Sequence, residues 1–522
     1  MAKRISIQGF EGSFHQIAAQ QFFGKTIDIF PCATFRDVIE STKSSQTDAS
    51  VMAIENSIAG SILANYNLLH KSNLQIAGEV YLPIRQHLLV NPGVRLEDIQ
   101  EVHSHPMAIL QCMEYLAKFN WKLVETEDTA LSAKHIHQVA NRLNGIGEYY
   151  FSQKLRQIEE MNKAGAAVIN LGIGSPDMAP DATVIDTLQI ESNKPTVHGY
   201  QSYKGVPKLR EAMSDWYQRW YGVSLDPAAE ILPLIGSKEG IMHICMTYLN
   251  EGDEALIPNP GYPTYRSAVT LAGAKCVEYK LTEEQNWQPD FDALQSSDLS
   301  KVKLMWVNYP HMPTGQLPTA ELFEKLVAFG QKHNILICHD NPYSFILNEQ
   351  PLSLLSVNGA KDVVIELNSL SKSHNMAGWR IGMLCGEKER IDEVLRFKSN
   401  MDSGMFLPLQ LAAASALALD EEWHEKLNDQ YKARREKVFE LLESVGCRYS
   451  TSQAGLFVWA KVPAEFGDGY ALSDQLLNEA KVFLTPGGIF GNEGDNYIRV
   501  SLCSKVENLE LAIQRIKTSL KK

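Results

Sequence analysis

The chain has 522 residues, 44% hydrophobic and 21% charged, a balance typical of a well-cored globular protein of three or four domain-sized units. Its net charge of −13 argues against a nucleic-acid or anionic-membrane partner, and no apolar run approaches the roughly eighteen residues of a membrane span. The eight cysteines form no C-x-x-C pair, and the first residues lack the apolar core of a signal peptide, so we expect a reducing, cytoplasmic setting.

Residues 1–137 alternate short strands with helical patterns, which predicts an α/β unit of modest size. We expect strands at 4–8, 26–30, 49–54, 86–90 and 123–127. Polar groups end some of these strands or open helices, namely Glu55, Asn56, Ser57 and Ser104. Such positions suit a small-anion cleft and equally suit capped helix starts.

Residues 140–165 are typical of a polar helical arm, whose apolar stripe indicates ordinary packing. Seven apolar runs separated by helical patterns follow, and they predict one large, mainly parallel sheet. We expect these strands near 230–235, 253–258, 275–280, 302–308, 335–339, 363–367 and 382–386. From about 395 to the end, a long helical stretch and short strands predict a smaller α+β lobe.

The chemically most informative residues lie where these strands end. Lys372 follows one apolar run, and Asp340 and Tyr343 follow another. Together with Arg380, they could hold pyridoxal phosphate: the lysine as an imine, the carboxylate at the pyridine nitrogen and the arginine at the phosphate. Taken alone, Asp340 could equally be a helix N-cap.

Two further segments lie at neighbouring strand ends. A glycine turn at 236–240 opens a helix whose N–H groups would suit a phosphate, although Gly-Ser turns start many helices. Tyr262, in a proline-rich loop, could stack on a flat ring or simply pack the turn.

In combination, residues 140–520 resemble the class I/II aminotransferases of PLP fold type I. That resemblance implies a large PLP-binding domain at about 185–395, with a mainly parallel seven-stranded sheet, and a small α+β domain from about 140–184 and 396–522. The segments that carry it are Leu171-Gly172-Ile173-Gly174-Ser175-Pro176-Asp177, Tyr200-Gln201-Ser202-Tyr203-Lys204-Gly205, the 236–240 turn, Asp340-Asn341-Pro342-Tyr343, the Lys372 segment with arginine eight residues on, and Tyr497-Ile498-Arg499-Val500-Ser501.

The resemblance also implies roles for individual residues. Lys372 binds the cofactor and then moves the proton, Asp340 keeps the pyridine nitrogen protonated, and Arg499 clamps the substrate carboxylate. The resemblance further implies that Tyr343 contacts the ring hydroxyl, that Tyr262 stacks on the ring face and that Gly174 contacts the substrate. The implied phosphate contacts are Ser237, Lys238, Ser369, Arg380 and, from a second copy in a homodimer, Tyr200. No metal site is expected.

One position departs from the family pattern. The family usually has asparagine directly before Pro-Thr-Gly, and this chain has Met312 there. A thioether donates no hydrogen bond, so we expect the cofactor imine to have a higher pKa than in relatives with asparagine.

Residues 1–137 resemble the catalytic region of prephenate dehydratases, which have a two-lobed α/β fold like periplasmic binding proteins. The match is carried by Glu55-Asn56-Ser57 with Gly60-Ser61, by Ser104-His105-Pro106 and by Asp128-Thr129-Ala130. It then stops, and the family's later Thr-Arg-Phe motif occurs nowhere in the chain. We therefore expect a truncated domain with little or no dehydratase activity.

The resulting expectation is an aminotransferase, residues 138–522, acting on an amino acid and a 2-oxo acid. The neighbouring dehydratase-like region points to an aromatic pair in phenylalanine biosynthesis. Alternatives are a diaminopimelate aminotransferase, a PLP-dependent C–S lyase, a bifunctional dehydratase and aminotransferase, or an N-terminal unit that only binds a ligand.

Overall fold

The structure is a computed structural model of the chain that describes residues 3–10, 12–56, 60–90, 94–126, 129, 132, 141–143 and 150–520. The chain divides into two compact units, Met1–Asn141 and Arg142–Lys522, each of which is described by itself. Within the described residues, no helix combines the length and apolar character that crossing a bilayer requires.

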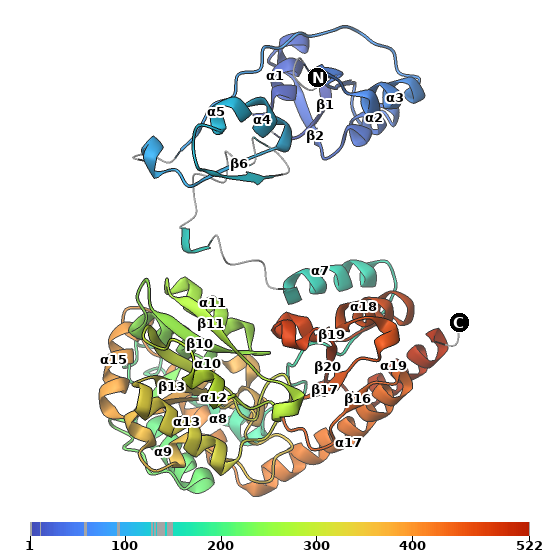
Figure 1. Cartoon of the computed structure of the whole chain (residues 1–522). Helices are drawn as coiled ribbons and strands as arrows, with labels where there is room; N and C mark the ends of the chain where they lie inside the picture. The colour runs from blue at the N-terminus through green and yellow to red at the C-terminus, as the bar shows by residue number, and fades with distance from the viewer. Residues whose placement is uncertain are drawn as a thin grey trace. The chain divides into compact units, whose positions relative to one another are not determined.

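The first unit contains a three-stranded parallel sheet (Figure 1), with β1 (Arg4–Gln8) between β2 (Asp28–Cys32) and β3 (Ala49–Val51). Ile5 and Ile7 of β1 are fully buried and form a small core with Ala19 of α1. The helices of this sheet are α1 (Phe14–Phe23) and α2 (Phe35–Lys43), the latter opened by a capping box of Thr34 and Asp37.

The remainder of this unit differs from expectation at residues 86–90. Residues 74–90 contain neither helix nor strand, and two of their side chains, Tyr81 and Leu89, are 84% and 53% exposed. A strand needs a neighbour to pair its backbone, and no described segment pairs with this one. The elements that do form here are the hairpin β4 (Glu55–Asn56) and β5 (Gly60–Ser61), α3 (Leu63–Ser72), the parallel pair β6 (Glu101–Ser104) and β7 (Lys122–Glu125), α4 (Pro106–Gln111) and α5 (Met113–Leu116).

A seven-stranded sheet forms the centre of the second unit and confirms the expected α/β fold. All neighbouring strands are parallel except β15, which is antiparallel to β14 and to β9. The order across the sheet is β11 (Lys275–Lys280), β10 (Glu254–Asn259), β12 (Val302–Val307), β13 (Leu336–Asp340), β14 (Val364–Ser369), β15 (Gly382–Gly386) and β9 (Ile231–Leu234).

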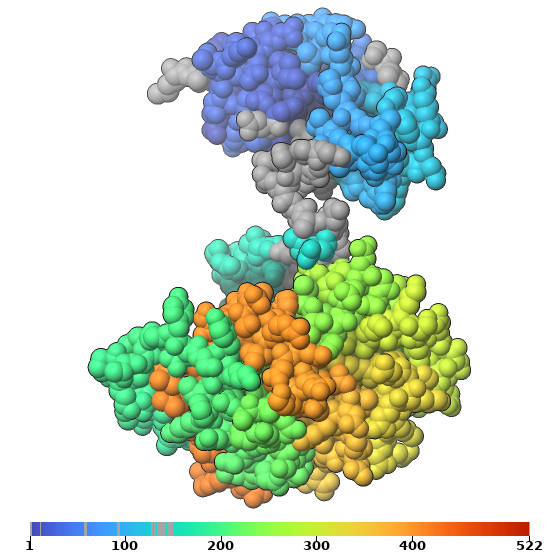
Figure 2. Space-filling model, turned by 90° about the vertical axis from the view of Figure 1, so that its left-hand side faces the viewer, coloured from blue at the N-terminus to red at the C-terminus, as the bar shows by residue number. Residues whose placement is uncertain are grey.

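Helices cover both faces of this sheet, so strand residues alternate between two apolar cores. Ile337 faces the core formed with α8, α9, α13 and α16, whereas its neighbour Cys338 faces the core formed with α10, α11 and α15. This alternation places consecutive residues of β13 on opposite faces. On the surface seen in Figure 2, the orange segment that includes α16 lies against the green segments that include α8 and α9.

The helices of these layers begin and end at residues suited to those positions. Pro207 starts α9 and left-handed Gly222 ends it, and Thr319 caps α13 by accepting from the Leu322 amide. Their bounds are α8 (Ala182–Ser192), α9 (Pro207–Tyr221), α10 (Ser237–Tyr248), α11 (Pro263–Leu271), α12 (Phe291–Gln295), α13 (Ala320–His333), α14 (Leu370–Ser373), α15 (Lys388–Lys398) and α16 (Leu407–Leu417).

The small lobe is the expected α+β element (Figure 1), with an antiparallel sheet in the order β16-β17-β20-β19. Its core packs β17 and β20 against the long α17 and against α19. The arm helix α7 lies along α18, where Lys154 Nζ donates to Asp474 Oδ1 at 2.7 Å and Ile158 is buried. The bounds here are α7 (Tyr150–Lys163), β8 (Ile169–Asn170), α17 (Glu421–Val445), β16 (Arg448–Tyr449), β17 (Phe457–Lys461), α18 (Gly469–Gln475), β18 (Val482–Phe483), β19 (Thr485–Pro486), β20 (Tyr497–Ser501) and α19 (Val506–Ser519).

Candidate active site

Lys372 lies in α14, the short helix that follows β14 directly. Ser369, the last residue of the strand, caps this helix by accepting from the Ser371 amide at 3.1 Å. The Lys372 ammonium nitrogen donates to the carbonyl oxygen of Gly174 at 2.6 Å, across 198 residues of sequence. Burial lowers the pKa of Lys372 to about 8, and the nearby Arg499 and Arg380 act in the same direction. A lysine with this pKa is partly neutral near physiological pH and can serve as a nucleophile or base.

Asp340 is the last residue of β13 and is 4% exposed. Its Oδ2 accepts the Tyr265 hydroxyl at 2.9 Å, whereas Oδ1 is buried and has no hydrogen-bond partner among the described residues. Burial raises the pKa of Asp340 to about 6, although the Tyr265 hydrogen bond lowers it. A buried carboxylate with a free oxygen is suited to a cationic ligand atom.

Arg499 lies on β20 and is 5% exposed. One guanidinium nitrogen donates to the Gly172 carbonyl at 3.0 Å and the other to the Met312 sulfur at 3.3 Å. The Phe457 ring centre is 3.7 Å from the guanidinium carbon, and the Phe490 ring centre is 4.6 Å from it. A thioether is a weak acceptor, so a substrate carboxylate could replace it on Arg499.

A glycine turn brings Arg380 against the start of α10. Gly236 has φ +81°, and a Cβ there would lie 2.1 Å from the Arg380 guanidinium. Ser237 begins α10, and its amide is beside Gly382, the first residue of β15. Arg380 itself has φ 58° and donates to the Ala377 carbonyl at 2.8 Å. A cation beside the start of a helix forms a cradle for a phosphate.

The other predicted residues of this site are placed as follows. Tyr262 precedes α11, and its ring centre is 5.6 Å from that of Tyr265. Burial raises the pKa of Tyr343, whose ring centre is 6.1 Å from that of Phe457. Gly174 packs under Phe457 so closely that a Cβ would lie 2.0 Å from the ring. Tyr200 is 95% exposed, and Lys238 is exposed at the start of α10.

Shared neighbours join these groups into one site. Gly174 contacts both Lys372 and the ring that covers Arg499, and Tyr262 lies near the charges of Asp340, Arg380 and Arg499. Pyridoxal phosphate fits this set, because the unpartnered Asp340 oxygen would suit a pyridinium and the Gly236 turn lets the Arg380 cation pack against the start of α10, where it would suit a phosphate.

The predicted residues of the first unit fall into two places. Glu55 accepts from Ser61 at 3.2 Å and from Tyr66 at 3.0 Å, beside Asn56 on β4. Ser104, at the end of β6, donates to the Thr129 hydroxyl at 3.1 Å. Glu55 and Ser104 share no hydrogen-bond partner among the described residues, and Ser57 lies outside them.

Several residues of the site were not predicted from sequence. Tyr265 holds Asp340, and Asn308 donates to the Asp340 carbonyl while accepting from the Met312 amide. Phe151 of α7 has its ring centre 5.8 Å from the Arg499 guanidinium carbon. The spacing of Tyr262 and Tyr265 near a helix start was a usable signal, whereas the aromatic rings around Arg499 come from distant segments.

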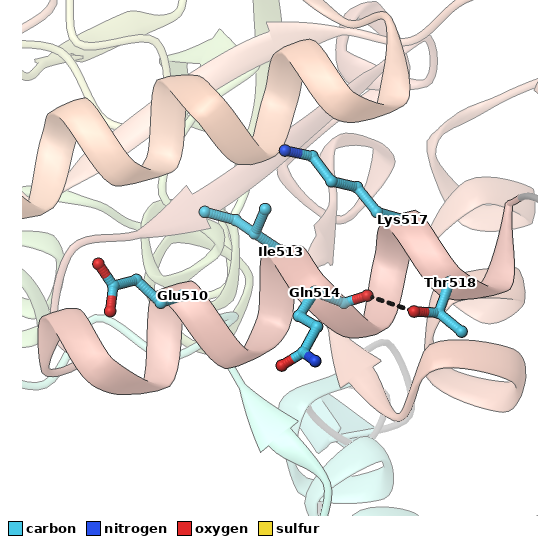
Figure 3. A pocket seen from close by; sticks show the side chains of 5 residues that line it. All are labelled: Glu510, Ile513, Gln514, Lys517 and Thr518. Atoms are coloured by element: carbon cyan, nitrogen blue, oxygen red, sulfur yellow. Dashed lines mark hydrogen bonds between the residues drawn. The ribbon is translucent and has the colours of Figure 1, made fainter.

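A surface depression of about 440 Å³ lies elsewhere, on α19 (Figure 3). It is lined by Glu510, Ile513, Gln514, Lys517 and Thr518, and Thr518 donates to the Gln514 carbonyl within the helix. None of these residues belongs to the group around Lys372.

Two family models match the chain in succession. The model for aminotransferase class I and II matches residues 166–516, and the model for prephenate dehydratase matches residues 5–155. Both resemblances inferred from the motifs are thereby confirmed.

Curated relatives and solved structures agree with the first model. The LL-diaminopimelate aminotransferase of Dehalococcoides mccartyi is 40% identical over 381 residues, which cover 73% of this chain and 98% of the relative. The enzyme of the same name from Aquifex aeolicus is 40% identical, with the same coverage. Among solved structures, BacF without ligand from Bacillus subtilis has TM-score 0.71 and 38% identity, covering 73% of this chain and 98% of its own. The aromatic aminotransferase of Pyrococcus horikoshii has TM-score 0.65 and 28% identity, covering 70% and 98%.

Proposed function

Because the chain belongs to the aminotransferase class I and II family, we propose that it transfers an amino group between an aromatic amino acid and a 2-oxo acid. The aminotransferase is PLP-dependent and carries a prephenate-dehydratase-type region at its N-terminus. The aromatic substrate is our proposal, and the rings around Arg499 are the observation that carries it.

The residues proposed to hold the cofactor are those at the strand ends. Lys372 would bind it covalently, Asp340 would pair with its ring nitrogen, and Tyr262 and Tyr343 would contact its ring. The proposed phosphate contacts are Ser237, Lys238, Ser369, Arg380 and the exposed Tyr200 of a second copy. When bound, pyridoxal phosphate supplies an aldehyde carbon for the amino group and a ring that draws electrons from the substrate α-carbon.

The side chains of this protein do the remaining work. Lys372 Nζ, with a pKa of about 8, would take the proton from the substrate α-carbon and deliver it, across the connecting nitrogen, to the carbon that the cofactor supplies. Asp340 stays ionised more readily opposite a cation, which favours a protonated ring nitrogen. Arg499 would hold the substrate carboxylate with two parallel hydrogen bonds, close to the Gly174 backbone.

The surroundings of Arg499 support an aromatic substrate. Three phenylalanine rings, Phe457, Phe490 and Phe151, have their centres 3.7, 4.6 and 5.8 Å from its guanidinium carbon. These rings give the surroundings of the proposed carboxylate clamp an apolar, polarisable surface, which suits an aromatic side chain. The matched prephenate dehydratase region supports the same class, because prephenate is a precursor of an aromatic 2-oxo acid.

A second candidate is the reaction in the name of the 40% identical relatives, LL-diaminopimelate transamination. The observation that favours this candidate is the overall sequence identity to these relatives. A diaminopimelate substrate would require polar groups in the site that bind its distal ammonium and carboxylate.

A donor and acceptor screen on the purified holoenzyme separates the candidates. Phenylpyruvate, prephenate and the diaminopimelate precursor would be offered with glutamate or aspartate, and kcat/KM would be measured for each. We expect kcat/KM for an aromatic acceptor to exceed that for the diaminopimelate precursor at least about tenfold, which corresponds to the stabilisation by one good aromatic contact. Preference for the diaminopimelate precursor would select the second candidate. In a separate incubation of an amino acid with 2-oxoglutarate, formation of glutamate rather than release of thiol would exclude a C–S lyase.

A substitution at Phe151 tests whether the phenylalanine rings around Arg499 determine the preference for an aromatic acceptor. Phe151→Ala removes the ring contributed by α7, and we expect kcat/KM for the aromatic acceptor to fall about tenfold. The matched control is Phe22→Ala, an exposed phenylalanine of the first unit, which should leave this value unchanged.

We also propose a homodimer in a reducing, cytoplasmic setting. Tyr200 is 95% exposed although the family motif places it at the phosphate, which is explained if it serves a second copy. All eight cysteines are free thiols and five of them are buried, as suits a reducing compartment. Sedimentation of the holoenzyme would test the dimer. Titration of Tyr200→Ala with pyridoxal phosphate would test the expected weakening of cofactor binding.

A further inference from the structure

His339, the residue directly before Asp340, is fully buried on the opposite face of the sheet from it. Its Nδ1 lies 2.7 Å from Glu366 Oε2, and its Nε2 lies 3.0 Å from the Tyr309 carbonyl oxygen. Glu366 is the cross-strand partner of His339 in the pairing of β13 with β14 and is also fully buried. The imidazole is therefore held between two oxygen atoms.

The partners of Glu366 define its charge. Its carboxylate accepts from the Tyr217 hydroxyl, the Ser353 hydroxyl and the Leu354 amide, each at 2.9 Å. A carboxylate that receives three donors in addition to the histidine is saturated in its ionised form. Neutralising it would break at least one of these contacts inside the core.

The two acceptors around the ring define the charge of His339. A carbonyl oxygen can only accept, so Nε2 must carry a hydrogen, and an ionised carboxylate requires a hydrogen on Nδ1 as well. Both ring nitrogens are donors only in the imidazolium form. The network thus contains a buried cation one residue from the carboxylate of Asp340.

We propose that His339 is a positioning residue whose positive charge keeps Asp340 ionised and sets the pH range in which the cofactor ring nitrogen is held protonated. The inference rests on the role proposed for Asp340. His339 also fixes the Tyr309 carbonyl, next to Asn308, whose amide donates to the Asp340 backbone. Charge and backbone position therefore reach Asp340 from the same network.

The neighbouring titratable groups do not substitute for this charge. Around His339 these are Glu366 on β14, Tyr217 and Tyr221 on α9 and Cys385 on β15, and burial raises the pKa of both tyrosines and of the cysteine, so they stay neutral. Around Asp340 they are Tyr262, Tyr265 and Tyr343, whose pKa values burial also raises. The histidine charge and the Tyr265 hydrogen bond both lower the pKa of Asp340, against the effect of burial.

The test removes both charges and loses one hydrogen bond, because an amide nitrogen at position 366 cannot accept from the Leu354 amide. The double variant His339→Gln with Glu366→Gln replaces the ion pair by two amides, which avoids an unpaired buried carboxylate that could unfold a single variant. Pyridoxal phosphate affinity of the apoenzyme would be measured from pH 5 to pH 9, with the nitrogen-15 shift of the ring nitrogen in labelled cofactor. We expect the acid midpoint to rise by about one pH unit, so that affinity at pH 5 falls about tenfold and affinity at pH 9 is unchanged.

Two controls make each outcome decisive. Ser353→Ala deletes one donor to Glu366 without changing any charge and should leave the midpoint in place. The inference is overturned if the folded double variant keeps the wild-type midpoint, or if Ser353→Ala shifts it equally. In Asp340→Asn, the fall of pyridoxal phosphate affinity at acid pH should disappear. If that fall persists in Asp340→Asn, the role proposed for Asp340 is refuted instead. None of these readouts depends on which 2-oxo acid is the substrate.

Discussion

Burial displaces the pKa values of Lys372 and Asp340 toward neutrality, to about 8 and about 6. Removing a charged group from water favours its neutral form, so the lysine becomes a better nucleophile and the carboxylate a weaker acid. The sequence shows only that both residues follow apolar strands. The size of the displacement depends on the packed neighbours, including Tyr265, which lies 75 residues before Asp340.

The lysine pKa predicts the pH dependence of cofactor attachment. Only the neutral amine attacks the aldehyde, so the attachment rate of apoenzyme should rise about tenfold per pH unit up to about pH 8 and then level. Stopped-flow absorbance gives the rate, and borohydride reduction with peptide mass locates the label on Lys372. Lys372→Ala should lose the label, whereas Lys388→Ala, at an exposed site on α15, should retain it. A rate that continues to rise to the ordinary pKa of lysine would contradict the burial.

Arg499→Lys tests the carboxylate clamp. Lysine keeps the charge but cannot form two parallel hydrogen bonds, so kcat/KM should fall about a hundredfold, or about 3 kcal/mol, with cofactor affinity unchanged. Steady-state kinetics and cofactor titration measure the two quantities. Arg515→Lys, at a half-buried arginine of α19 that donates to the Ala167 carbonyl, serves as control. Equal losses in cofactor affinity would show that Arg499 supports the cofactor site instead.

At the scale of elements, the site depends on short turns rather than on the long helices. The 236–237 turn, the Lys372 helix and the 377–380 turn each follow or precede a strand of the sheet. Gly236 lies against the Arg380 guanidinium, and the 236–237 backbone lies against Gly382 of β15. Such approach requires glycine where a side chain would collide.

Gly236→Ala should damage both stability and cofactor binding. The new methyl would lie 2.1 Å from the Arg380 guanidinium, and φ is +81°. We expect a loss of about 1–3 kcal/mol in unfolding free energy and a clear loss of pyridoxal phosphate affinity, measured by urea unfolding and by titration. Gly252 has φ +91°, and a Cβ there would have nothing within 4 Å among the described atoms. Gly252→Ala therefore measures the free-energy cost of the left-handed backbone alone. If both variants bind the cofactor normally, the turn is not part of the cradle.

At the scale of the whole molecule, an aminotransferase region follows a prephenate-dehydratase-type region along the chain. The boundary between residues 137 and 138 remains a prediction. In the first unit, the expected strand at 86–90 is absent and Tyr81 and Leu89 are largely exposed. Exposed apolar side chains and unpaired backbone are what a lobe without its returning strand would leave.

Prephenate turnover tests this reading. We expect the purified chain to dehydrate prephenate at less than about a hundredth of the rate of an intact dehydratase, because the Thr-Arg-Phe motif of that family does not occur in the chain. Phenylpyruvate absorbance in alkali measures the product, and an intact relative with its Thr-Arg-Phe motif is the control. Turnover at a comparable rate would show that the described hydroxyls, such as Ser104, suffice.

The sequence by itself determined the fold class and the seven strands of the large sheet, and it is the source of the proposal that Lys372, Asp340, Arg380 and Arg499 are the chemical groups. These follow from local patterns, since apolar runs specify strands and the motifs directly follow them.

Only the tertiary structure decided which groups surround them. The Lys372–Gly174 contact, the Tyr265–Asp340 hydrogen bond and the rings around Arg499 join segments up to several hundred residues apart. Contacts of this kind depend on packing, so no local pattern predicts them. For the same reason the strand expected at 86–90 failed: its pattern was local, but strand pairing needs a partner from elsewhere in the chain.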